Sequence, residues 1–206
     1  MKRLLFAFFI FCSVGISFGQ QVWENKELSF SIQKPENWFV AENKKLIDIL
    51  KTPDLTDRNI DTIVEMFNGD LLVRFQKYNP KIKTTLNPSI QIQIRPKPAD
   101  DFQGLKKWII ASGEELKQAK NSVEDFKFIE EIREVEISGI KSIFFVIELK
   151  KKTKDETTLI TRAQMLGIPY KNYFFRVNFI VESDGQTDEN CTKVFDELIK
   201  TIKIGK

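Results

Sequence analysis

The first nineteen residues predict a secretory signal peptide, which determines the part of the chain that can fold. Residues 1–19 begin with two basic residues, continue with an apolar run over residues 4–18 and include small residues at Ser17 and Gly19. A basic start, a short apolar run and a small-residue cleavage site are the three parts of such a signal. We therefore predict cleavage between Gly19 and Gln20 and a secreted or periplasmic protein.

An uncleaved membrane anchor is the alternative for this segment. Its apolar run is shorter than the roughly 20 residues that a helix needs to cross a bilayer, so we favour cleavage. No later segment of the sequence approaches that length. We therefore expect residues 20–206 to contain no transmembrane segment.

Length and composition predict that residues 20–206 form a single domain. A chain of this size can build a full hydrophobic core. Charged residues make up 30% and aromatic residues 12%, which is typical of a globular protein. Loss of the two N-terminal basic residues lowers the net charge from +3 to +1, since 3 − 2 = 1. A protein so close to neutrality has no general attraction for nucleic acid.

The absence of histidine excludes several classes of function. The whole sequence contains none, which excludes Ser-His-Asp and Cys-His catalysis and every metal site that includes histidine. Cys191 is the one cysteine that remains after cleavage, so no internal disulfide can form. We therefore predict a fold held by its hydrophobic core, with no catalytic residue, no cofactor and no metal site.

Hydrophobic periodicity predicts a sheet with several helices. Alternating residues predict strands at 28–33, 70–78, 90–95, 126–137, 140–150, 157–166 and 173–181. Three- and four-residue spacing predicts helices at 43–68 with a break at Pro53, at 102–119, and after Gly185, where an apolar stripe runs from Cys191 to Ile202. Most strands follow one another as hairpins, which predicts an α+β protein with a largely antiparallel sheet and helices on one or both faces. Gln91, Gln93 and Arg95 alternate with isoleucines, which predicts one solvated face for that strand.

The two ends of the domain resemble PsbP-like domains. The segment Phe30-Ser-Ile-Gln-Lys-Pro-Glu-Asn-Trp38 is similar to their opening strand and its Pro-x-x-Trp turn. The aromatic strand at 173–181, followed by an amphipathic helix that includes residues 195–202, is similar to their end. Between the two ends the resemblance is topological, and the region 43–68 is longer than expected for that family.

The resemblance implies an α/β/α sandwich around a largely antiparallel sheet. PsbP-like domains include extrinsic photosystem subunits, bacterial envelope proteins and a Ran-binding import factor, which are mostly binding or assembly factors without a shared catalytic site. It therefore implies a non-enzymatic binding or assembly protein with a protein partner. Metal sites of the photosystem branch use histidine in part, so none can be assigned to this chain.

One acidic cluster is a candidate site. Asp57, Asp61 and Glu65 are spaced by four residues, so a helix would place them on one face, with Asp54 just before it. Carboxylates in such a group could hold calcium or serve a hydrolase. The spacing matches no calcium loop, and we favour a solvated helix face.

The remaining candidates have structural interpretations that we favour. The basic segment 150–154 is interpreted as a solvated hairpin turn, and Cys191 as a buried, inert thiol. Trp38 and Trp108 are expected in or at the edge of the core. The sequence places three tyrosines at strand or loop ends, where we expect them to be exposed: Tyr78, Tyr170 and Tyr173.

Three functions remain open, and a structure can discriminate between them. A filled core favours the extracytoplasmic, non-enzymatic binding protein that the resemblance implies. A deep pocket with two facing carboxylates about 5 to 10 Å apart favours a carboxylate-based hydrolase. A wide apolar cavity lined by phenylalanines favours a carrier of a small apolar ligand.

Overall fold

The computed structural model describes residues 21–52, 57–67, 69–82, 86–118, 125–152, 156–183 and 186–205. The predicted signal peptide, its cleavage site, Pro53 and Asp54 lie outside these residues. The strands of the larger sheet are β3 (Phe39–Glu42), β4 (Leu71–Gln76), β5 (Ser89–Pro96), β6 (Asp125–Phe128), β7 (Arg133–Ile137), β8 (Ile140–Lys152), β9 (Thr158–Tyr170) and β10 (Tyr173–Glu182).

The larger sheet is antiparallel throughout. Its order in the described residues is β3-β4-β5-β10-β9-β8-β6, and β7 also pairs with β8. A smaller sheet has the order β1-β2-β11. Its strands are β1 (Val22–Asn25), β2 (Phe30–Gln33) and β11 (Lys203–Ile204). The described helices are α1 (Lys44–Leu50), α2 (Asp57–Met66), α3 (Phe102–Gln118) and α4 (Gln186–Ile199).

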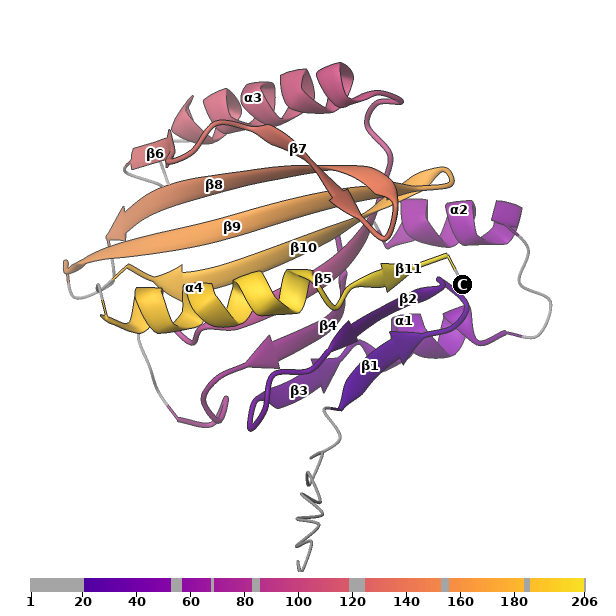
Figure 1. The fold of residues 1–206 in the computed structure, drawn as a ribbon, viewed down its shortest axis with the longest axis horizontal. Helices are drawn as coiled ribbons and strands as arrows, with labels where there is room; N and C mark the ends of the chain where they lie inside the picture. Colours follow the sequence, from indigo (N-terminus) through magenta and orange to yellow (C-terminus); the bar gives the residue numbers. More distant parts are fainter. Residues whose placement is uncertain are drawn as a thin grey trace, which may run out of the picture.

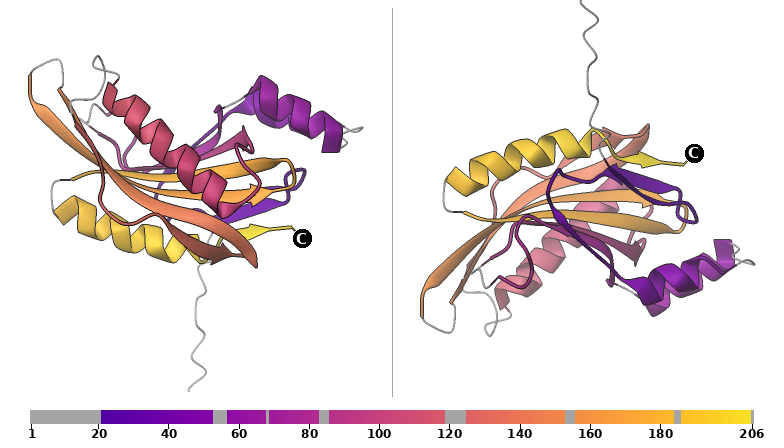
Figure 2. Two further views of the ribbon diagram at one scale, coloured as in Figure 1. Left: turned by 90° about the horizontal axis from the view of Figure 1, so that it is seen from above. Right: turned by 90° about the horizontal axis from the view of Figure 1, so that it is seen from below.

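The helices and the small sheet cover both faces of the larger sheet (Figure 1). Helix α3 crosses one face, whereas α4 and the small sheet lie on the other (Figure 2). This arrangement confirms the predicted α+β class and the largely antiparallel sheet with a helix on each face. None of the helices in the described ranges is both long and apolar enough to cross a membrane.

The α4 side contains the larger hydrophobic core. The apolar stripe of the last helix packs there, as its spacing predicts. Phe195 contacts Phe179 of the sheet with ring centroids 4.9 Å apart and meets Trp38 edge-on at 6.4 Å. The predicted positions of Trp38 in the core and of Cys191 in a buried site are therefore confirmed, with exposures of 8% and 1%.

Several predicted strands differ from the observed ones. The single irregular strand predicted at 126–137 is wrong, because β6 and β7 are two strands that pair with different parts of β8. The first strand, which was predicted at 28–33, begins two residues later than predicted, at Phe30. It belongs to the small sheet. Strands β1, β3 and β11 were not predicted. Each is four residues or shorter.

The tyrosines are less exposed than predicted. Tyr173 has 1% of its surface exposed, and Tyr170 is half-buried. Their rings lie 5.8 Å apart, and each also contacts Phe175 of the same sheet face. Aromatic neighbours across the β9–β10 turn therefore bury two of the three, and Tyr78 alone is exposed as expected.

Candidate functional site

The α3 side of the sheet carries a second hydrophobic cluster, separate from the core beneath α4. Strand alternation places Ile143, Phe145 and Ile147 of β8 on this face, and pairing with β9 adds Ala163 and Met165. Leu105 and Ile109 of α3 close the cluster from above. This helix therefore has a continuous apolar floor beneath it.

A cavity of about 270 Å³ lies between α3 and this floor. Its walls are mostly aromatic and aliphatic side chains from α3, β6, β8, β9 and β10. Phe128 meets Phe126 at 5.1 Å and Phe145 at 6.1 Å, with the rings edge to face, and all three line the cavity. Trp108 lines it too and meets Phe174 edge-on at 6.2 Å.

The cavity exists because α3 packs mainly against the strands near one edge of the sheet. Its contacts are with β6 and β8, near the edge, and less with the central strands. The side chains facing the space there include small ones, Ser112 on α3 and Ala163 on β9. Small groups on both walls leave volume that neighbouring side chains do not fill.

One end of the cavity is polar. Gln91 of β5 and Arg176 and Asn178 of β10 line it beside the apolar walls. Asn178 is 3% exposed, and its Nδ2 donates a long 3.5 Å hydrogen bond to Gln93 Oε1. Its Oδ1 is buried and has no partner among the described residues. Buried polar atoms are usually paired, so this end is unusual for a hydrophobic core.

The polar end continues into a row of basic side chains. Gln91 pairs in register with Arg74 and Asn178, and Gln93 with Arg176. Arg95 lies on the same face, diagonal to Arg176. The guanidinium group of Arg95 lies close to Gly69: a Cβ atom added to Gly69 would be 2.6 Å from Arg95 Nη2.

These arginines lack counter-charges within the described part of the chain. The Nε atoms of Arg74, Arg95 and Arg176 are buried without a hydrogen-bond partner there, and no described carboxylate pairs with them. Burial, with a further contribution from the charge of Arg95, lowers the pKa of Arg176 to about 10. Burial also lowers the pKa of Arg95. Among the described residues, the positive charge of this site is therefore not compensated by a carboxylate.

This row corrects the sequence prediction of a solvated face for β5. Gln93 is buried, and Gln91 and Arg95 are half-buried. Gln91 lines the cavity beneath α3. Gln93 is covered by the chain after α2, and its Nε2 donates a hydrogen bond to Gly69 O at 2.7 Å. The pattern gave the correct face, but neighbours distant in sequence determine its exposure.

The predicted acidic cluster forms no site that the structure shows. Asp61 accepts a hydrogen bond from Asn172 Nδ2 at 2.7 Å, and Glu65 is exposed on the same helix. Asp57 begins that helix, but its side chain and Asp54 lie outside the described residues. Within the described ranges, no three His, Cys, Asp or Glu side chains are grouped so as to hold a metal ion.

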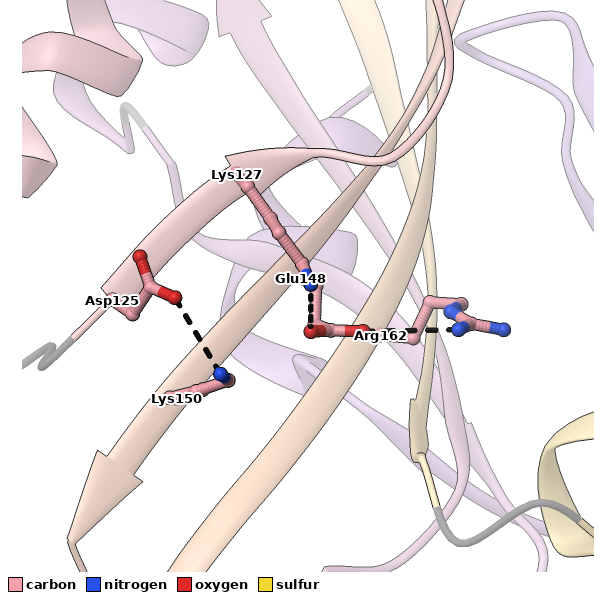
Figure 3. Close-up of polar contacts among 5 residues, drawn as sticks. All are labelled: Asp125, Lys127, Glu148, Lys150 and Arg162. Atoms are coloured by element: carbon pink, nitrogen blue, oxygen red, sulfur yellow. Dashed lines mark ion pairs between the residues drawn. The ribbon is translucent and has the colours of Figure 1, made fainter.

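The charged residues near β6 and β8 form an ion-pair network on the other face of the sheet (Figure 3). Glu148 lies between Lys127 Nζ at 2.8 Å and Arg162 Nη2 at 3.7 Å. Lys150 pairs with Asp125 at 3.6 Å. The turn predicted at 150–154 therefore begins later than expected, because β8 continues to Lys152. These basic residues are paired within the sheet.

A second hollow lies at the sheet edge and differs from the cavity. It has a volume of about 320 Å³ and is lined by residues of β1 and β3 with their neighbours. Val22 and Val40 in its lining are 59% and 44% exposed, whereas buried side chains dominate the lining of the cavity under α3. We interpret this hollow as a surface groove.

The sequence signal for the polar end was present but was not recognised. Arg176 and Asn178 alternate with Phe175 and Val177 in a strand that is otherwise aromatic and aliphatic. A charged residue inside such a strand must either face solvent or have a specific role. Which of these applied depended on the pairing of β10 with β5, more than seventy residues earlier.

No protein-family model and no curated protein sequence matches this chain. Similar solved structures include PsbP (CyanoP) of Synechocystis sp. PCC 6803, with a TM-score of 0.55 at 10% identity, covering 93% of this chain and 96% of that one. LpqN of Mycobacterium tuberculosis, involved in cell envelope biogenesis, has a TM-score of 0.48 at 9% identity, covering 86% and 83%. The Ran-binding protein Mog1p of Saccharomyces cerevisiae has 0.45 at 9%, covering 89% and 94%.

Only the first of these scores is high enough to support an inference, and at 10% identity it concerns the fold alone. It confirms, at the level of the fold, the resemblance seen at the two ends of the sequence. This chain has the fold of a PsbP-like domain.

Proposed function

We propose that this protein is an extracytoplasmic, non-enzymatic binding protein that holds a small apolar ligand in the cavity beneath α3. The single observation that carries the proposal is this cavity, with a volume of about 270 Å³ and mostly apolar walls. Ligand sites typically have volumes of about 300 to 1,000 Å³ and apolar linings with a few polar groups. An apolar cavity of about 150 Å³ already binds benzene.

The composition of the cavity lining supports binding over hydrolysis. None of the described residues that line it carries a carboxyl group, whereas a carboxylate-based hydrolase needs two that face each other. Asp61 and Glu65 lie on α2, and none of the described side chains of that helix contributes to the lining. The location outside the cytoplasm is supported by the predicted signal peptide at residues 1–19, which precedes the proposed domain at 20–206.

Filling the cavity should weaken ligand binding. Ala163 is buried in the cavity floor, so an Ala163→Phe side chain would occupy the space of the ligand. We expect isothermal titration with decanol, a neutral single-chain probe, to show one site in the wild type. In the variant we expect binding at least about tenfold weaker, or about 1.4 kcal/mol.

Ala111→Phe is the matched control. Ala111 belongs to α3, the helix that covers the cavity, and its side chain is exposed. Its decanol affinity should equal that of the wild type. Urea unfolding of all variants shows whether Ala163→Phe is folded. Equal decanol affinity in a folded Ala163→Phe variant, or no decanol binding by the wild type, would refute binding in this cavity.

A protein partner is the second candidate, and the exposed edge strand β3 favours it. All four of its residues are exposed, including Phe39 at 42% and Val40 at 44%. Exposed edge strands with apolar side chains can accept an added strand from another chain. The proposed partner therefore presents an extended segment that pairs with β3.

A lysine at this edge should prevent such pairing. We expect Val40→Lys to lose at least about tenfold in the yield of any protein that copurifies stoichiometrically from envelope extract. Met66→Lys, at an exposed methionine on α2, is the control and should retain it. A partner that binds both variants equally well does not use β3.

A further inference from the structure

The polar end of the cavity is more specific than an apolar ligand requires. A purely apolar ligand would gain nothing from a partly buried guanidinium group, and burial of an unpaired charge is costly. Arg176 nevertheless lines the cavity, and its Nε is buried and unpartnered among the described residues. Asn178 beside it has a buried, unpartnered Oδ1. Two adjacent residues of the lining thus each have a buried polar atom without a described partner, a donor on Arg176 and an acceptor on Asn178.

The charge around this end has one sign. Arg95 and Arg74 extend the row on the same sheet face, and no described carboxylate forms an ion pair with any of the three arginines. The α3 residues above the cavity are apolar or neutral. Like charges on neighbouring strands destabilise a sheet. An anion placed here would reduce that repulsion and accept hydrogen bonds from the guanidinium group of Arg176.

We propose that this cavity binds a single-chain anionic amphiphile, with its apolar tail beneath α3 and its head group at Arg176 and Asn178. The inference rests on the proposed function and adds the chemical class of the ligand. The tail contacts Trp108, Phe126 and Phe145, which line the apolar walls. Arg176 supplies the hydrogen-bond donors for the head group, and Asn178 can donate only through its Nδ2, which makes the long 3.5 Å hydrogen bond to Gln93 Oε1.

Comparison of ligands that share one tail tests the head-group selectivity. We expect decanoate to bind the purified protein about ten to a hundred times more tightly than decanol, because hydrogen bonds to charged groups have effects of that size. Decyltrimethylammonium should bind more weakly than decanol. Inorganic phosphate alone should bind far more weakly than decanoate, since it lacks the tail. Isothermal titration at one fixed ionic strength measures all four.

Removal of the central charge should erase the selectivity and leave the cavity intact. In Arg176→Met, decanoate affinity should fall to about that of decanol, and decanol affinity should stay within about twofold of wild type. Arg133→Met is the matched control, because it removes the same charge from an exposed residue of β7. It should retain the preference for decanoate. Arg176→Lys provides a second variant that keeps a positive charge and should retain part of the preference.

The outcomes separate this inference from the proposed function. Failure of decanol and decanoate alike to bind would overturn both. Equal binding of decanol and decanoate by the wild type would leave the apolar cavity site and refute the anionic head group. A preference for decanoate that persists in a folded Arg176→Met variant would place the head group elsewhere. Phosphate binding as tight as decanoate binding would show that the tail is not used.

Discussion

Truncation of Trp38 to alanine should lower the free energy of unfolding by about 3 to 5 kcal/mol, which is the range for large buried aromatic residues. Trp38 is almost fully buried and packs edge-on against Phe195 of α4. Its backbone N–H closes the turn after β2 by donating to Pro35 O at 3.3 Å. Loss of the indole would leave a void between this turn and the helix, and such a void adds to the cost of the lost burial. Urea denaturation measures the change as a lower midpoint with an unchanged slope.

Phe39 is the matched control for this prediction. It is the next residue along the chain and has 42% of its surface exposed. Phe39→Ala should therefore change the free energy of unfolding by less than about 1 kcal/mol. Similar losses in the two variants would mean that the contribution of Trp38 does not come from its burial.

The helices show how far periodicity alone can predict this fold. A helix buries residues that are close in sequence, so the stripe from Cys191 to Ile202 identified α4 and its buried face, although the helix itself ends at Ile199. The helix at 102–119 was predicted nearly to its last residue for the same reason. Strand pairing is different, because β5 pairs with β10 across a gap that contains α3 and four other strands. Local alternation contains no information about that partner.

The candidate site was missed for the same physical reason. Phe126, Phe145 and Trp108 belong to three elements that only the folded chain brings together around the cavity. Arg176 and Arg95 lie in two strands whose pairing could not be predicted. The sequence therefore did not indicate that these two positive charges lie close together. The sequence did restrict the chemistry: without histidine, it left binding and carboxylate catalysis as the main choices. A cavity favouring a carrier was one of the outcomes foreseen.

Replacement of Arg176 by methionine should stabilise the ligand-free protein by about 1 to 3 kcal/mol. Most substitutions of buried residues destabilise, so the sign of this effect is diagnostic. Burial and the charge of Arg95 lower the pKa of Arg176 to about 10, and each unit of such a shift corresponds to about 1.4 kcal/mol. The pKa shift multiplied by this energy per unit sets the upper limit of the gain in the free energy of unfolding. Methionine has a similar length, carries no charge and adapts to irregular apolar space.

The pH dependence of this gain has a defined direction. The folded protein holds the proton of Arg176 less tightly than the unfolded chain does, so in the window above about pH 10 the unfolded state binds more protons. The wild type therefore regains stability as the pH rises through that window, and the full cost of the buried charge is present below about pH 10. Arg95 faces Arg176 from the neighbouring strand β5, Arg74 lies one strand further away on β4, and both remain in the variant.

Urea unfolding of wild type and Arg176→Met at about pH 8 and about pH 11 measures both the sign and the trend. We expect the variant to be the more stable protein at the lower pH and its advantage to narrow at the higher pH. Other titrating groups are common to both proteins, so the difference between them isolates Arg176. A variant less stable than wild type at pH 8 would mean that Arg176 makes a stabilising interaction in the ligand-free fold. The unsatisfied charge would then no longer support an anionic ligand, and Arg176 would have a structural role.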